Sequence, residues 1–164
     1  MKKEITPVRN RISNEARKVV IGGTFDILHK GHEAILRRAF ELGEVAIGLT
    51  SDKMAREMRN REIKNFKERK KELENFIINE FKIEPKIFKI ENKFGFTLEK
   101  DFNYIIVSPE TYKTALEINR ERKKRKKKLI EIVEIDFVLA EDGKPISAER
   151  IVKGEINREG KLLK

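Results

Sequence analysis

Apolar and polar positions alternate in blocks along the chain, and the blocks have two different periods. Residues 18–23 (KVVIGG) and 44–50 (EVAIGLT) are short apolar runs, a pattern typical of buried strands in a parallel sheet. Between them, residues 32–43 (HEAILRRAFELG) place apolar side chains at helical spacing and end at a glycine. These segments predict a βαβ unit whose strand-to-helix junction is GGTFDILHKGH, residues 22–32.

The rest of the chain continues this alternation. Strands are predicted over residues 85–91, 102–108 and 128–140, and helices over 66–82, 108–124 and 146–156, the last capped by Ser147. A turn is predicted at Asp142-Gly143. Strands and helices that alternate over one domain length predict an α/β fold, a doubly wound parallel sheet with right-handed crossovers.

Chain length and the lack of cysteine narrow the class of protein. The 164 residues suit one domain, which we assign to residues 18–164, with residues 1–17 as a polar N-terminal extension. Because cysteine is absent, any metal site would have to use histidine and carboxylates. The apolar runs are short and the N-terminus lacks the apolar region of a signal peptide, so we expect a soluble cytoplasmic protein.

A formal net charge of +10 favours anionic partners such as nucleotides, coenzyme phosphates, nucleic acid or acidic lipid. The basic run at residues 120–128 (RERKKRKKK) is a candidate nucleic-acid patch, but it has no interleaved aromatic residues. It also lies at the end of a predicted helix, where cations suit the helix dipole. We therefore expect a solvated helix end and no nucleic-acid or membrane partner. The sequence does not determine the oligomeric state, and we favour a monomer.

The junction at residues 22–32 contains both histidines of the chain, His29 and His32. In a doubly wound sheet, ligands bind beyond the carboxyl ends of the strands, where successive connections leave toward opposite faces. The glycines allow a close approach of the backbone, and the helix that begins near His29 directs free N–H groups at an anion. Together with Thr24 and nearby Lys53, the junction predicts a site for a triphosphate.

Three interpretations of the histidine pair are open. The spacing i, i+3 places both rings on one side of the first helical turn. A metal pair would need further ligands, for which Asp26 is the nearby candidate, and the histidines could also be purely structural. We favour phosphate-binding imidazoles, because a histidine donor can stabilise charge that develops on a phosphate oxygen in a transition state.

The residues GTFDILHKGH resemble the T/HxGH signature of the nucleotidyltransferase superfamily, whose members transfer a nucleotidyl group from a nucleoside triphosphate and release pyrophosphate. The resemblance implies a Rossmann-like fold with three α/β/α layers. It also implies that His32 stabilises the pentavalent phosphate, that His29 contacts phosphate, and that Thr24 orients the phosphate of the acceptor.

Downstream segments are similar to the archaeal and eukaryotic form of the pantetheine-phosphate adenylyltransferase family, over roughly residues 18–162. The similar segments are LTSDKMARE, FKERKKELENFI, VSPETYKTALEINRER and ISAERIVKGEINREGKL. The implied activity is adenylyl transfer from ATP to 4′-phosphopantetheine, which gives dephospho-coenzyme A and pyrophosphate. The implied catalytic residues are His32, Thr24 and Lys53; the ATP-binding residues are Gly23, Thr24, Phe25, His29, His32, Arg122 and Ser147; the acceptor-binding residues are Thr24, Asp26 and Lys53.

One departure from this family lies near the C-terminus. A Ser-Thr pair follows the first serine of the family's closing motif, whereas this chain has Ala148 and Glu149. Ser147 and backbone N–H groups are left to hold phosphate. Bacterial relatives also carry an arginine pair after the fourth strand, where this chain has Ser108 and Thr111, and we look to Arg122 and Lys53 for replacement charge. Asn119 is a further candidate site residue in the same helix as Arg122.

Further expectations concern the cofactor, the acceptor and the class of protein. We expect Mg²⁺ to enter with ATP, bound largely through phosphate and water. Phe94 and Phe96 anchor a loop on the core, with a wall for pantetheine as the alternative. Another acceptor within the superfamily, nicotinamide mononucleotide or a cytidylyltransferase substrate, is the nearest alternative function, followed by a basic nucleic-acid-binding module.

Overall fold

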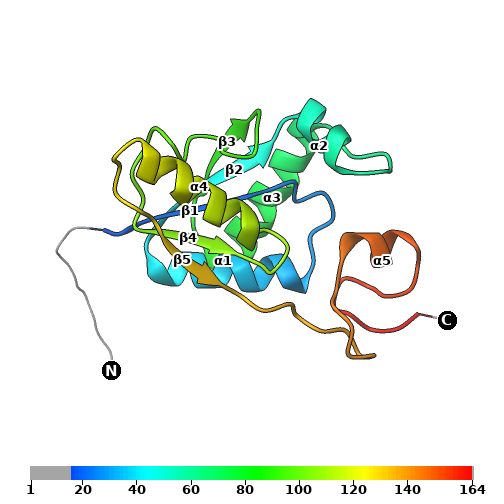
Figure 1. Ribbon diagram of the computed structural model, residues 1–164. Helices are drawn as coiled ribbons and strands as arrows, with labels where there is room; N and C mark the ends of the chain where they lie inside the picture. The colour runs from blue at the N-terminus through cyan, green and yellow to red at the C-terminus, as the bar shows by residue number, and fades with distance from the viewer. Residues whose placement is uncertain (1–15, 164) are drawn as a thin grey trace, which may run out of the picture.

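The computed structural model describes residues 16–163 and contains one five-stranded sheet flanked by helices (Figure 1). The strands are β1 (Lys18–Gly23), β2 (Glu44–Thr50), β3 (Lys86–Ile90), β4 (Tyr104–Val107) and β5 (Glu131–Glu134). The helices are α1 (Lys30–Leu42), α2 (Asp52–Met58), α3 (Phe66–Phe81), α4 (Tyr112–Lys124) and α5 (Ala148–Val152). The predicted N-terminal extension lies almost entirely outside the described residues, and that domain boundary stays a prediction.

All paired strands are parallel, in the order β3-β2-β1-β4-β5. The chain moves outward from β1 to β3 and then returns to the other side of β1, so the direction of winding reverses between β1 and β4. The predicted Rossmann-like, doubly wound parallel sheet is therefore confirmed. The reversal also places a crevice at the carboxyl ends of β1 and β4, where such folds bind their ligands.

The two faces of the sheet are covered by different helices. Because side chains alternate along a strand, Val19 and Ile21 of β1 pack with α1 and α3, whereas Val20 packs toward α4. Leu36 and Ala39 of α1 join Leu73 and Ile77 of α3 in the first core. The second core contains residues of α4 and of the loop that precedes β4. Both layers bury apolar side chains, which confirms the three-layer arrangement.

The sequence did not predict helix α2. It is seven residues long, begins at the cap Ser51, whose hydroxyl accepts from the Met54 N–H at 3.2 Å, and buries only Ala55. One buried position is too few to produce a helical period in the sequence.

The final predicted strand is shorter than expected. Residues 128–140 alternate, but β5 comprises only Glu131–Glu134, because its partner β4 has four residues to pair with. Beyond Ile135 the chain leaves the sheet and crosses toward α5 (Figure 1). The predicted helix at 146–156 is likewise reduced to five residues, although Ser147 caps it as expected.

The C-terminal segment forms a small unit with its own core. Ala140, Ile146 and Ile156 are buried together, apart from the two cores of the sheet. The Lys30 N–H, at the start of α1, donates to the Arg158 carbonyl at 3.2 Å and so ties this unit to the β1–α1 junction. In this way α5 is brought to the carboxyl edge of the sheet, beside the histidines. In the described part of the chain, no helix is both long and apolar enough to cross a membrane.

Candidate active site

A cavity of about 530 Å³ lies at the carboxyl ends of three strands. Phe25 and Asp26 enter it after β1, Ser108 after β4 and Asp136 after β5. The first turn of α1 forms one wall and α5 forms the opposite one. Its polar lining includes His29, His32, Arg59, Arg61, Ser147, Glu149 and Arg150.

His29 and His32 close the first turn of α1 by a reciprocal capping arrangement. His29 is the N-cap, and its Nδ1 accepts from the Gly31 N–H at 3.0 Å. The Nδ1 of His32 accepts from the His29 N–H at 3.2 Å, so each ring satisfies one free backbone donor. The ring centroids lie 4.0 Å apart, which places both imidazoles side by side on the cavity wall.

These hydrogen bonds determine what the imidazoles can offer a ligand. A neutral imidazole carries one N–H, and because Nδ1 of each ring accepts, the proton of each ring resides on Nε2. Burial, with the charge of Arg158, lowers the pKa of His29 to about 4. Burial, followed by His29 and Arg59, lowers the pKa of His32 to about 3. Near pH 7 the pair therefore consists of two neutral N–H donors, well suited to an anion.

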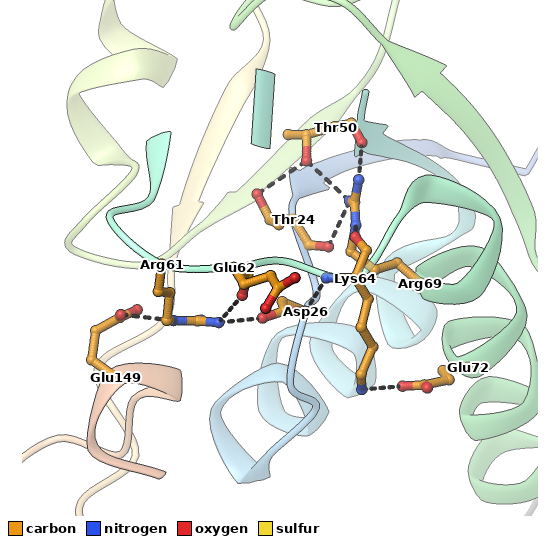
Figure 2. A network of polar contacts seen from close by, with 9 residues as sticks. All are labelled: Thr24, Asp26, Thr50, Arg61, Glu62, Lys64, Arg69, Glu72 and Glu149. Atoms are coloured by element: carbon orange, nitrogen blue, oxygen red, sulfur yellow. Dashed lines mark hydrogen bonds and ion pairs between the residues drawn. The ribbon is translucent and has the colours of Figure 1, made fainter. Parts of the chain in front are cut away.

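Thr24 is held by a chain of hydrogen bonds that runs through the interior (Figure 2). Its hydroxyl oxygen lies 3.0 Å from Thr50 Oγ1, which lies 3.2 Å from Arg69 Nη1. The same guanidinium donates to the carbonyls of Thr24, Thr50 and Lys64 at 2.8 to 3.1 Å. Arg69 is 0% exposed. It fixes the carboxyl ends of β1 and β2 relative to each other.

Asp26 is buried and engaged by the loop between α2 and α3. Its carboxylate accepts from Arg61 Nη1 at 2.5 Å and from the Lys64 N–H at 3.4 Å. Arg61 Nε also donates to Glu149 at 2.9 Å, so this arginine connects the β1–α1 junction to α5 (Figure 2). Asp26 lines the cavity as predicted, but its contacts are those of an anchor for the loop.

Ser147 and the residues after it stand opposite the histidines. The Ser147 hydroxyl accepts from the Arg150 N–H at 3.2 Å, so it serves as the cap of α5. Arg150 itself pairs with Asp142 and Glu155. Glu149 pairs with Arg61. The α5 side of the cavity therefore presents a carboxylate.

The predicted role of Arg122 in ATP binding does not agree with its position. Arg122 is 0% exposed, and its guanidinium donates to the carbonyls of Thr97, Lys100 and Lys128 and to Asp101. These contacts join the end of α4 to the loop before β4, on the face of the sheet away from the histidines. Asn119 has a similar structural role, since its amide exchanges two hydrogen bonds with the backbone of Ile130.

The other predicted residues are divided between the cavity and its surroundings. Phe25 lines the cavity and packs on His32, with ring centroids 5.1 Å apart. Gly23 lines a second, apolar cavity, and Thr24 lies between the two in sequence. Lys53 is exposed on the first turn of α2 and lines neither cavity. The structure thus brings together Phe25, Asp26, His29, His32 and Ser147 in the larger cavity. Thr24, which is buried, lines neither cavity, and the same holds for Lys53 and Arg122.

The second cavity, of about 120 Å³, lies over the carboxyl halves of β1 and β4. Its lining is mostly apolar and includes Met54 and Met58 of α2 and Phe94 and Phe96 of the loop before β4. Thr111 and Thr114 add hydroxyl groups. Phe94 and Phe96 thus line a cavity as well as contacting the core.

Three arginines of the site were not identified from the sequence: Arg59, Arg61 and Arg69. A signal existed for Arg69, which falls in the helical period of Phe66, Leu73 and Phe76, where a core residue is expected. A charged residue at such a position must be paired in the interior. Arg59 and Arg61 lie in a loop without a period, so nothing in the sequence pattern indicated them.

A family model described as cytidylyltransferase-like matches residues 20–154, and the chain belongs to this family of nucleotidyl-transferring α/β proteins. Within it, the relatives carry a more particular name. A phosphopantetheine adenylyltransferase of Archaeoglobus fulgidus is 46% identical over 148 residues, covering 89% of this chain and 99% of that protein. A phosphopantetheine adenylyltransferase of Methanosarcina acetivorans is 49% identical over 152 residues, covering 88% of this chain and 95% of that protein.

Solved structures agree on the fold. A crystal structure of an A. fulgidus protein, described as of unknown function, superposes with a TM-score of 0.70 at 43% identity, covering 73% of this chain and 89% of that one. A pantoate-beta-alanine ligase of Francisella tularensis, crystallised with beta-gamma ATP and beta-alanine, has a TM-score of 0.55 at 10% identity, covering 84% and 65%. The second likeness shows the shared fold alone.

Proposed function

We propose that this protein transfers the adenylyl group of ATP to the phosphate of 4′-phosphopantetheine, giving dephospho-coenzyme A and pyrophosphate. The names of relatives that are 46% and 49% identical over most of the chain support this acceptor. The observation that carries the chemistry is the pair of neutral imidazoles at the start of α1. Their Nδ1 atoms accept from the backbone, so their Nε2–H groups are the donors that the rings can offer to a ligand on the wall of a nucleotide-sized cavity.

The reaction needs no nucleophile from the protein. A phosphate oxygen of the acceptor attacks the α-phosphorus of ATP in line, the new P–O bond forms, and the bond to the pyrophosphate oxygen breaks. Charge accumulates on the oxygens of the α-phosphate as the transition state forms. His32 Nε2–H, with His29 beside it, donates to these oxygens and stabilises the charge that develops on them.

The two cavities suggest how the substrates lie. ATP occupies the larger cavity, with its phosphates between the histidines and α5. The pantetheine arm occupies the apolar cavity beside Phe94, Phe96 and Met54. Thr24 follows the end of β1, between Gly23 of the smaller cavity and Phe25 of the larger one, and its hydroxyl holds the acceptor phosphate near the α-phosphorus. Positioning of this kind supplies a large share of the barrier reduction in phosphoryl and nucleotidyl transfer.

Magnesium enters this proposal with the nucleotide. The described residues contain no group of three or more histidine and acidic side chains arranged to hold a metal. We propose that Mg²⁺ binds to the phosphates of ATP and to water, where it neutralises phosphate charge. The protein's own residues orient the phosphates around it.

A panel of acceptors tests the proposed function. Purified protein is incubated with ATP and Mg²⁺ and with 4′-phosphopantetheine, nicotinamide mononucleotide or phosphocholine, and pyrophosphate release is measured for each. We expect turnover with 4′-phosphopantetheine and none above background with the others. A second series with CTP in place of ATP tests the nucleotide. Turnover with another acceptor and none with 4′-phosphopantetheine would show that the proposed acceptor is wrong.

A further inference from the structure

The loop between α2 and α3 carries two arginines to the large cavity. Arg59 ends α2 in an extended conformation, with φ −127° and ψ 147°, and Arg61 follows two residues later. Both arginines line the cavity that His29 and His32 also line.

Both arginines keep donors unused within the described residues 16–163. Arg59 Nε and Arg61 Nη2 are buried, and neither has a hydrogen-bond partner among those residues. A buried guanidinium donor without a partner is costly, and native structures seldom keep one unless something else satisfies it. Arg59 and His32 line the same cavity, and the charge of Arg59 contributes to the lowered pKa of His32.

Arg61 is held between two carboxylates of different character (Figure 2). The Asp26 side chain is only 5% exposed, whereas the Glu149 side chain is 50% exposed. The buried contact with Asp26 fixes the position of Arg61. The contact with Glu149 is exposed at the rim of the cavity and is therefore weak. An incoming anion can therefore replace Glu149 while Asp26 keeps the arginine in place.

A triphosphate in the large cavity would need positive charge beside it, and few other side chains there can supply it. The histidines are neutral near pH 7, Arg122 is buried elsewhere, and Arg150 is paired with Asp142 and Glu155. A triphosphate carries several negative charges and requires cations that can donate paired hydrogen bonds, which guanidinium groups provide.

We propose that Arg59 and Arg61 together bind the polyphosphate of the nucleotide, and that Glu149 competes with this polyphosphate for Arg61. The proposal rests on the proposed function for the identity of the nucleotide. It identifies the residues that bind the polyphosphate of the nucleotide. It also proposes that Glu149 weakens nucleotide binding. Because the Glu149 carboxylate pairs with Arg61 at the rim of the cavity, the proposal assigns it a restraining effect on nucleotide affinity.

Equilibrium binding to four variants tests this assignment. Arg59→Gln and Arg61→Gln each remove a guanidinium, Glu149→Gln removes the competing charge, and Arg56→Gln on the exposed face of α2 is the control for net charge. Calorimetry gives dissociation constants for ATP, inorganic tripolyphosphate and 4′-phosphopantetheine, each alone. Tripolyphosphate lacks both base and acceptor, so its binding isolates the phosphate contacts. Thermal unfolding of each variant establishes that it is folded.

The proposal predicts opposite effects from the two kinds of substitution. Arg59→Gln and Arg61→Gln weaken ATP and tripolyphosphate about 10- to 100-fold, as expected for loss of charge-assisted hydrogen bonds. Their dissociation constants for 4′-phosphopantetheine change less than twofold. Glu149→Gln tightens ATP and tripolyphosphate about two- to fivefold, in keeping with an exposed ion pair. Arg56→Gln leaves all three constants near those of the parent protein.

Three results would overturn the proposal. Unchanged tripolyphosphate binding in Arg59→Gln, whose side chain makes no hydrogen bond with residues 16–163, would remove that arginine from the site. Weaker ATP binding in Glu149→Gln would show that Glu149 supports the site. Selective loss of 4′-phosphopantetheine binding would assign the arginines to the acceptor. None of these measurements depends on turnover, so failure of the proposed acceptor would leave this test intact.

Discussion

The Arg69 guanidinium donates from Nη1 to Thr50 Oγ1 at 3.2 Å, and this contact orients the protons of a buried threonine pair. Among the described residues, the Thr24 oxygen, 3.0 Å away, is the hydrogen-bond acceptor for the Thr50 hydroxyl. Thr50 therefore donates to Thr24, and the hydroxyl proton of Thr24 is left for a ligand. Arg69 thus acts as a positioning residue for Thr24 without lining either cavity.

We expect Thr50→Val to weaken the acceptor selectively. Valine has the shape of threonine but cannot donate to Thr24, so the orientation of the Thr24 hydroxyl is lost. One hydrogen bond of this kind corresponds to about 0.5–1.5 kcal/mol, so the KM for 4′-phosphopantetheine should rise about 2- to 12-fold. The KM for ATP should stay within about twofold. Steady-state kinetics with each substrate varied in turn provide the measurement.

Thr50→Ser is the matched control, because serine keeps the hydroxyl and should retain parental KM values. Equal KM values for 4′-phosphopantetheine in the valine variant and the parent would contradict the role given to this pair.

Substitutions of the histidines can separate capping from catalysis. Glutamine at position 32 can still accept from the His29 N–H, as in a capping box, and asparagine at position 29 is a favoured N-cap residue. His32→Ala removes cap and donor together and should lower kcat about 10²- to 10³-fold, the loss seen when one transition-state donor is deleted. His32→Gln should keep the stability of the parent and recover part of kcat.

His29→Asn should fold as stably as the parent and still lose turnover. Urea unfolding alongside kcat distinguishes the two roles. The comparison covers His32→Ala, His32→Gln and His29→Asn. If kcat fell only in those variants that also lost stability, the histidines would act as capping residues alone.

The histidines also predict how stability depends on pH. Their folded pKa values, about 4 and about 3, lie below the ordinary value of 6.5. Below pH 6.5 the unfolded chain binds protons that the folded chain does not, so stability falls as the pH falls. The loss begins near pH 6.5 and continues to about pH 4 for His29 and about pH 3 for His32, at up to about 1.4 kcal/mol per pH unit for each histidine.

Urea unfolding at pH 7 and pH 5 measures this difference. The parent protein should lose more stability between these values than the double variant His29→Asn, His32→Gln, in which the carboxylates are unchanged. Identical losses in the two proteins would contradict the burial of neutral imidazoles.

Arg122 should matter for stability and not for nucleotide binding. Its removal would leave the carbonyl of Thr97 without its donor in the interior, and those of Lys100 and Lys128 without theirs in a partly buried position. An unpaired buried group costs about 1–3 kcal/mol, so Arg122→Met should lower the free energy of unfolding by at least about 1–3 kcal/mol. The dissociation constant for ATP, measured below the unfolding transition, should match the parent's. Loss of ATP binding in the folded variant would restore the role first expected for Arg122.

Elements with a strong apolar period were predictable from the sequence. The bounds of β1 and β2 agree with the expected strands, and α3 ends one residue before the predicted end, because these segments bury alternate or helically spaced apolar residues. The junction with His29 and His32 was also predictable, since one local segment supplies the strand end, the turn and the helix start.

Contacts between distant segments were not predictable in this way. Arg61 reaches Asp26 and Glu149, which are 35 and 88 residues away in sequence. Arg122 was expected at the nucleotide because its helix contains a family-like motif, yet helix α4 turns this side chain into the core. The direction of a side chain depends on which face of its helix packs on the sheet, and a motif alone does not determine that.

The central step of the proposed reaction is attack by the phosphate of 4′-phosphopantetheine at the α-phosphorus of ATP. ATP labelled with ³²P at the α-position, incubated with the protein, Mg²⁺ and 4′-phosphopantetheine, tests this directly when the products are separated. The label should appear in dephospho-coenzyme A, none should appear in pyrophosphate, and the transfer should be strongly reduced in His32→Ala. Label that remains in ATP, or that appears in AMP or ADP with no labelled dephospho-coenzyme A, would contradict the account.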